Sequence, residues 1–228
     1  MTRIILFDNL KGIAFILMVI QHIFFFYDLS NNFTTALSKN ILVNDCGIIA
    51  RTLFIVLAGI SVYLNNKNKN KSIKKTVSRS LQIGLHALLI TIITYIYYPN
   101  LYVRFGILHF LAISTLLCSF ISSYSIITIL FFIFLLIFKV CSINPFIDTI
   151  TGAKVLYNMI DYFPMSKWLP LLIFGIIIAQ NINLYDLKYL DNKSILTRNN
   201  ILTTLGKNSL ELYTFHIILL ILVYSLKK

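Results

Sequence analysis

The chain has 228 residues, of which 58% are hydrophobic and only 12% are charged, and its mean hydropathy is +0.82. This composition excludes an ordinary soluble domain and is typical of a polytopic membrane protein. The formal net charge of +12 is high, but the Lys and Arg residues lie between apolar segments, where the positive-inside rule explains them, so no nucleic-acid partner is expected. The three cysteines fit neither a metal-binding spacing nor a disulfide framework, and no metal site is predicted.

Seven apolar segments predict seven membrane spans, at about 11–28, 47–64, 80–98, 106–122, 124–141, 167–182 and 205–225. The first segment lacks a small-residue cleavage site, which favours a retained helix over a signal peptide. Because neither a soluble domain nor an internal repeat is visible, we expect an all-α integral membrane helical bundle. The whole chain, 1–228, is interpreted as a single transmembrane domain.

The loop at 65–79 carries six cations, and this concentration predicts that it is cytoplasmic. Two spans precede the loop, so the N-terminus is predicted to be cytoplasmic too. The membrane that we expect for this protein is the cell membrane of a microbe. An anionic partner of the loop, such as lipid headgroups or a nucleotide-bearing acyl donor, is the alternative explanation.

The first span contains the feature around which the sequence is organised. Asp8, Lys11, Phe15, Met18 and His22 follow helical spacing and are predicted to share one face. An imidazole in a membrane-spanning helix is costly unless it faces protein, water or a substrate path. A catalytic or ligand-contacting histidine and a histidine that bonds a neighbouring helix are equally compatible with these residues.

Other ionisable residues are predicted at a similar depth, in the outer half of the membrane: Arg51, Arg104, His109 and Asp161. Each has a structural alternative, because arginines can extend to the interface, a histidine can bond a carbonyl, and an aspartate can cap a helix. In the last span, Ser209, Tyr213 and His216 share a face by their spacing. Together these groups predict a common polar chamber between the spans.

The chemistry of these groups suits acyl transfer. A neutral imidazole can act as a general base toward an amine or hydroxyl, and a nearby arginine can hold an anionic group or stabilise an oxyanion. The sequence contains no nucleophile elbow, P-loop, HExxH or CxxC motif, so a serine hydrolase, a nucleotidase or a zinc enzyme lacks support.

Five stretches, spread in order along the chain, resemble the catalytic-domain family of heparan-α-glucosaminide N-acetyltransferase. They are RIILFDNLKGIAFILMVIQH from Arg3, ARTLFIVLAGISVYL from Ala50, YYPNLYVRFGILHFLAI from Tyr97, DYFPMSKWLPLLIFGIIIA from Asp161 and LGKNSLELYTFH from Leu205. The FGILH segment is the most specific of these. Lys11 stands where the family usually has Arg, and Ser166–Lys167 replaces an apolar–Pro pair.

The resemblance implies a multi-helix membrane acyltransferase that takes acetyl-CoA on the cytoplasmic side and an acceptor sugar on the other. It implies that His22 lies at the reaction centre, and we expect His109 as a second catalytic histidine. The expected substrate-binding residues are Arg104, Asp161, Trp168, Ser209 and His216, and the expected donor-binding residues are Arg3, Asp8 and Lys11. Because the chain is shorter than other members of the family, we expect the acceptor to be a microbial glycan or a small amino sugar rather than heparan.

Two other classes of protein fit the same residues. The polar groups could line the path of a transporter, although the inverted repeats common in transporters are not visible. The chain could also be a scaffold subunit with a decayed site. The lipid bilayer is the expected surrounding in every case, and a homo-oligomer is compatible with all three.

Overall fold

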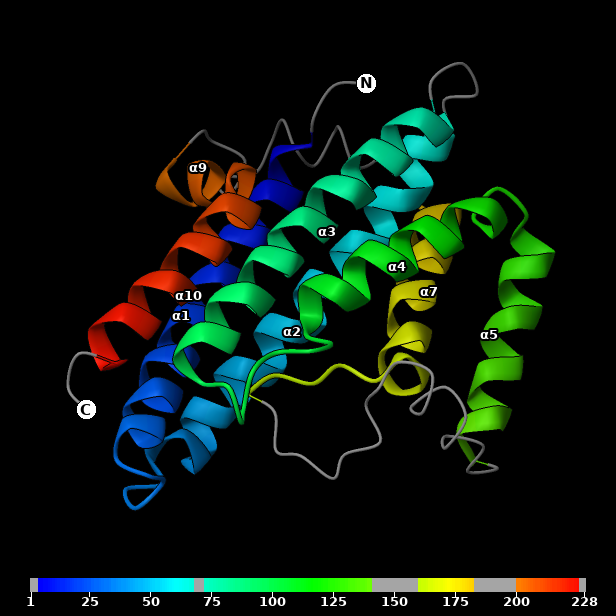
Figure 1. Cartoon of the computed structure of the whole chain (residues 1–228). Coiled ribbons are helices and arrows are strands. Elements are labelled where there is room, and N and C mark those ends of the chain that lie inside the picture. The colour runs from blue at the N-terminus through cyan, green and yellow to red at the C-terminus, as the bar shows by residue number, and fades with distance from the viewer. Residues whose placement is uncertain (1–3, 68–71, 141–159, 183–199, 226–228) are drawn as a thin grey trace. The chain divides into compact units, whose positions relative to one another are not determined.

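The computed structural model describes residues 4–67, 72–140, 160–182 and 200–225. These residues form eight α-helices and a 3-10 helix, and no strand is present among them (Figure 1). In chain order the elements are α1 (Ile5–Ser30), η1 (Leu37–Lys39), α2 (Ile41–Asn66), α3 (Ser72–Tyr97), α4 (Ile107–Ile121), α5 (Ser125–Val140), α7 (Met165–Asn181), α9 (Ile201–Lys207) and α10 (Ser209–Ser225). The all-α prediction is confirmed.

A helix lies in each of the seven ranges predicted to span the membrane. By length and composition, α1, α2 and α3 can each cross a bilayer, and α9 and α10 reach that length only if the bent pair counts as one span. The helices α4, α5 and α7 are apolar but shorter. These apolar helices identify an integral membrane protein.

The prediction of one continuous span over 205–225 is wrong in detail. α9 ends at Lys207, α10 begins at Ser209, and the two helices are bent by 85°. The residue between them, Asn208, has φ −105° and ψ 21°, which is not helical. The predicted span included the end of α9 because Leu205 and Gly206 come shortly before the apolar residues of α10, although Lys207, Asn208 and Ser209 at the break are polar.

The chain packs as two compact units. The first comprises residues 1–54 and 182–228, and the second comprises residues 55–181. The long helix α2 contributes its first half to the first unit and its second half to the second.

In the first unit, α1 packs against both α9 and α10, which are the blue, orange and orange-to-red ribbons of Figure 1. The contact between α1 and α9 is close, since Gly12 lies against the carbonyl of Leu202 and Gly206 lies against the carbonyl of Asp8. Beside these glycines, the Thr203 hydroxyl donates a hydrogen bond to Oδ1 of the buried Asn9 at 2.6 Å. Small residues therefore bring the two backbones together, as membrane helices commonly do.

The connection from α1 to α2 is organised by Asp28, which is fully buried. Its carboxylate accepts hydrogen bonds from the Thr35 hydroxyl at 2.5 Å, the Leu37 amide at 3.0 Å and the Ser38 amide at 2.7 Å. These bonds hold η1 against the end of α1, so the role of this carboxylate is structural.

In the second unit, α3 packs on α4, and α7 packs on both α4 and α5. Gly59 of α2 lies against the Leu172 carbonyl, and Gly175 of α7 lies against the Val56 carbonyl, so these two glycines allow α2 and α7 to pack closely. Gly84 differs, because a Cβ there would meet only the Ala112 methyl group at 3.9 Å.

Two side-chain amides cap the C-terminal end of α4. Asn66 donates from Nδ2 to the Ser119 carbonyl and to the Ser122 hydroxyl, both at 2.7 Å. Gln180 donates from Nε2 to the Ser122 carbonyl at 2.9 Å. The last carbonyls of a helix have no partner within it, so these amides from α2 and α7 satisfy them.

Candidate active site

His22 of α1 lies beside His216 of α10 in the first unit. Nδ1 of His22 and Nε2 of His216 are 2.9 Å apart, and the two rings are nearly parallel, with centroids 5.2 Å apart. The other ring nitrogen of His216, Nδ1, lies 3.1 Å from the Leu212 carbonyl one turn earlier in α10. Two residues that are 194 positions apart in the sequence therefore form one imidazole pair.

The helical face predicted for α1 is the face that carries this pair. Phe15 and Met18 are buried on it, and His22 follows one turn later, half-buried. The Phe15 ring packs edge-on against His216, with centroids 5.5 Å apart. The helical spacing thus predicted the correct face of α1, but it could not identify His216 as the neighbour of His22.

Two more residues of the first unit belong to the surroundings of the pair. The Tyr213 ring contacts both imidazoles, with centroids 5.3 Å from His216 and 6.1 Å from His22. Arg51 of α2 is a charged neighbour of His22 and donates from Nε to the Gly47 carbonyl at 2.9 Å. Ser209 lies at the first position of α10, about two turns before His216, and is half-buried.

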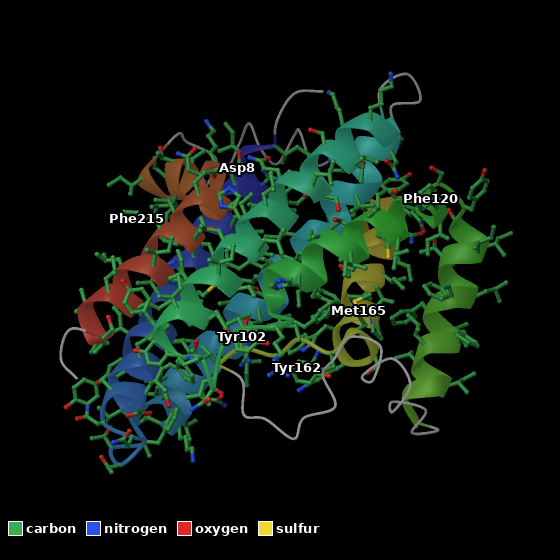
Figure 2. The ribbon with its side chains drawn as sticks, in the orientation of Figure 1. Asp8, Tyr102, Phe120, Tyr162, Met165 and Phe215 are labelled. Carbon is green, nitrogen blue, oxygen red and sulfur yellow. The ribbon has the colours of Figure 1, made fainter. Side chains whose placement is uncertain are left out.

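The residues expected to bind the donor lie near the start of α1. Asp8, labelled in Figure 2, is buried, with 3% of its surface exposed, and its backbone carbonyl lies against Gly206 of α9. Lys11 is half-buried one turn further along the helix. Arg3 lies outside the described residues. Lys11 is the described member of this set whose positive charge suits the phosphates of a coenzyme, and the predicted role of Asp8 in binding the donor stays a prediction.

His109 lies in the second unit, where both of its ring nitrogens make hydrogen bonds. The Gly106 amide donates to Nδ1 at 3.3 Å, which closes a capping box at the N-terminus of α4. Nε2 lies 3.2 Å from the Thr91 hydroxyl, and this hydroxyl donates to the Val103 carbonyl at 2.8 Å. The ring thus ties the first turn of α4 to α3.

Asp161 lies at the same end of α4. Its Oδ2 accepts a hydrogen bond from the Ile107 amide at 3.1 Å, where a negative charge is favourable to the helix. Phe105 and Tyr162 form an isolated parallel β-bridge, and the Phe163 amide donates to the Phe105 carbonyl at 2.9 Å. The FGILH and DYFP stretches therefore lie side by side, on the segments labelled by Tyr102 and Tyr162 in Figure 2.

The other two residues expected to bind substrate are also in the second unit. The Arg104 guanidinium lies over the Tyr102 ring, 4.7 Å from its centroid. The Trp168 ring packs against Phe163 at 5.0 Å, and the Lys167 ammonium lies 5.2 Å from the indole. The predicted roles of these residues in substrate binding stay predictions.

The structure thus groups the predicted residues into two sets: His22, Ser209 and His216 with Asp8 and Lys11 in the first unit, and Arg104, His109, Asp161 and Trp168 in the second. A single chamber formed by both sets stays a prediction. Within the described ranges, no group of three or more His, Cys, Asp or Glu side chains could hold a metal ion.

Residues 3–218, nearly the whole chain, match the family described as heparan-alpha-glucosaminide N-acetyltransferase, catalytic. The chain belongs to this family. The membership predicted from the five sequence stretches is therefore confirmed. No curated protein and no solved structure matches the chain.

Sequence reasoning missed two neighbours of the candidate residues and did not identify the partner of a third. Thr91 bonds His109, and the Leu212 carbonyl bonds His216. Arg51 is a neighbour of His22, whereas the sequence predicted only that the two residues lie at a similar depth in the membrane. A threonine in an apolar segment and a backbone carbonyl carry no distinguishing pattern. Tyr213 was placed on the correct face by its spacing from His216.

Proposed function

We propose that this chain is a membrane acyltransferase that moves an acetyl group from acetyl-CoA to an amino or hydroxyl group of a sugar or glycan across the membrane. Membership of an N-acetyltransferase catalytic family over residues 3–218 carries the proposal. The half-buried imidazole of His22, paired with a second histidine between apolar helices, supplies the base that such a transfer needs.

His22 acts as the general base in this proposal. Its Nε2 takes a proton from the acceptor nitrogen or oxygen as that atom bonds the acyl carbon, and the same proton then passes to the departing sulfur. Acetyl-CoA supplies the activated acyl carbon and a good leaving group. The acceptor loses one proton, the coenzyme thiol gains one, and His22 returns to its starting state.

The other residues bind and orient in this proposal. We place the protein in the cell membrane of a microbe, with its N-terminus on the cytoplasmic side. On that side Lys11, with Arg3, holds the phosphates of the donor. Arg51, which neighbours His22, stabilises negative charge on the acyl oxygen during transfer. Ser209 binds the acceptor, and Arg104, Asp161 and Trp168 shape the acceptor side. The acceptor is a small amino sugar or a microbial glycan.

The test is acyl transfer by the purified full-length protein in detergent or nanodiscs. The protein is incubated with labelled acetyl-CoA and a panel of amino sugars, and labelled product is counted. We expect transfer by the wild type and a loss of about 100-fold or more in His22→Ala, because a positioned general base contributes about 10²–10⁴-fold. Equal transfer by wild type and His22→Ala would remove His22 from the mechanism.

The matched control is His86→Ala, which removes a half-buried imidazole from α3, where the proposal gives it no role. We expect its rate to stay close to that of the wild type. Reconstituted vesicles provide the contrasting result for the whole proposal. Sugar flux without dependence on acetyl-CoA, together with no labelled product, would identify a transporter instead.

A further inference from the structure

We infer that His216 is a positioning residue that holds His22 in the tautomer protonated at Nδ1, so that Nε2 of His22 presents its lone pair. The inference concerns the histidine pair itself, and its meaning for catalysis rests on the proposed function. It follows from the directions of two hydrogen bonds that form a chain from the backbone of α10 to the ring of His22.

The first bond fixes His216. Its Nδ1 lies 3.1 Å from the Leu212 carbonyl oxygen, which can only accept a hydrogen bond. Nδ1 of His216 therefore carries the proton. In a neutral imidazole the second nitrogen then has no proton and is an acceptor, so Nε2 of His216 presents a lone pair.

The second bond fixes His22. Nε2 of His216 accepts, and Nδ1 of His22 lies 2.9 Å away, so Nδ1 of His22 must donate. Nε2 of His22 is then the unprotonated nitrogen of the pair. Within the described part of the chain it makes no hydrogen bond, so its lone pair is free to take a proton from a substrate.

The packing around His216 explains why the ring can hold this direction. His216 is buried, with 7% of its surface exposed, and Phe15 and Tyr213 contact it edge-on at centroid distances of 5.5 and 5.3 Å. Rotation of the ring would break the bond to Leu212 and both aromatic contacts. A buried, contacted ring is well suited to orient a second ring, as the partners of metal-binding histidines do.

The pair can also hold one added proton without moving. When Nε2 of His22 gains a proton, the proton on Nδ1 of His22 can pass to Nε2 of His216. His216 then donates from Nδ1 to the Leu212 carbonyl and from Nε2 to Nδ1 of His22. The heavy atoms keep their positions, and the single positive charge is shared by the two rings. Release of the proton from Nε2 of His22 restores the first state.

The decisive measurement is the nitrogen NMR spectrum of the full chain labelled with ¹⁵N-histidine in nanodiscs. The sequence has four histidines, so single variants at His86 and His109 leave few signals to assign. We expect His22 to be protonated at Nδ1 in the neutral wild-type protein. A His22 that is protonated at Nε2 would overturn the inference, whatever the enzyme activity.

Two variants of His216 separate positioning from simple packing. In His216→Gln, the side-chain oxygen can still accept the proton of His22 Nδ1, and we expect the same tautomer. In His216→Leu the acceptor is lost, and we expect the protonation of His22 to move toward Nε2. The inference fails if the two variants give the same His22 spectrum while both remain folded.

Activity provides a separate readout. We expect kcat to fall by about 10–100-fold in His216→Leu and by less in His216→Gln, with KM little changed, because the variant acts through His22. Active enzyme with His22 protonated at Nε2 would refute the inference and leave the proposed function standing. The expected tautomer in a protein without acyltransfer would refute the proposed function and leave the inference standing.

Discussion

Gly206 of α9 lies directly against the backbone carbonyl of Asp8 on α1, so closely that a side chain has no space between them. Gly12 makes the reciprocal contact, against the carbonyl of Leu202. The short helix α9 is thus held against the first turns of α1, the helix that carries His22 further along. Substitutions at this contact test whether α9 fixes the start of the motif helix.

We predict that Gly206→Ala destabilises the protein by about 1–3 kcal/mol, the usual cost of inserting an extra carbon into a packed interior. The new Cβ would meet the Asp8 carbonyl, which is backbone and cannot turn away. Gly84→Ala is the control, because its Cβ would make only an ordinary contact with Ala112 at 3.9 Å. Thermal unfolding in detergent measures both, and equal midpoints would contradict the close contact.

The hydrogen bond beside this contact gives a second prediction. The Thr203 hydroxyl donates to Asn9 Oδ1 at 2.6 Å, and both residues are buried. Thr203→Val keeps the shape but removes both the donor to Asn9 and the acceptor of the Asn200 amide in the capping box of α9, so we expect a loss of about 1–3 kcal/mol in the free energy of unfolding. Thr204→Val is the matched control, since its exposed hydroxyl makes only a long bond of 3.4 Å to the Asn200 carbonyl. A loss in Thr203→Val no larger than that in Thr204→Val would contradict a stabilising role of the buried hydroxyl.

The sequence predicted where helices lie better than how they meet. Apolar length set the helix ranges, and helical spacing placed Phe15, Met18 and His22 on one packed face of α1. Spacing gives a face and not a partner, so the pairing of His22 with His216 could not be predicted. The break at Asn208 was missed because mean hydropathy is taken over a window of many residues, and one non-helical residue changes that mean little.

The capping of α4 gives a third prediction, in the second unit. Asn66 makes two bonds of 2.7 Å to the end of α4 and is buried, whereas its neighbour Asn65 is exposed. We expect Asn66→Ala to lower the unfolding midpoint clearly, by losing about 1 kcal/mol or more per bond, and Asn65→Ala to leave it nearly unchanged. The pair is compared by thermal unfolding in one detergent. An Asn65→Ala midpoint as low as that of Asn66→Ala would contradict the capping role.

The last prediction concerns His109, whose two ring nitrogens are both engaged. Because the Gly106 amide donates to Nδ1, this nitrogen presents a lone pair, and in a neutral ring Nε2 carries the proton and donates to Thr91. Neither nitrogen is then available as a base in this arrangement. The role of His109 as a second catalytic histidine would require one of these bonds to open.

The two roles predict opposite results for His109→Gln. The side-chain oxygen of glutamine at this third helical position can accept from the Gly106 amide, as glutamine does in capping boxes. If His109 caps α4, we expect His109→Gln to keep both its unfolding midpoint and its acyl transfer, while His109→Leu loses about 1 kcal/mol of stability with the cap. A folded His109→Gln protein whose transfer falls about 100-fold or more, as expected for His22→Ala, would instead place His109 in the chemistry.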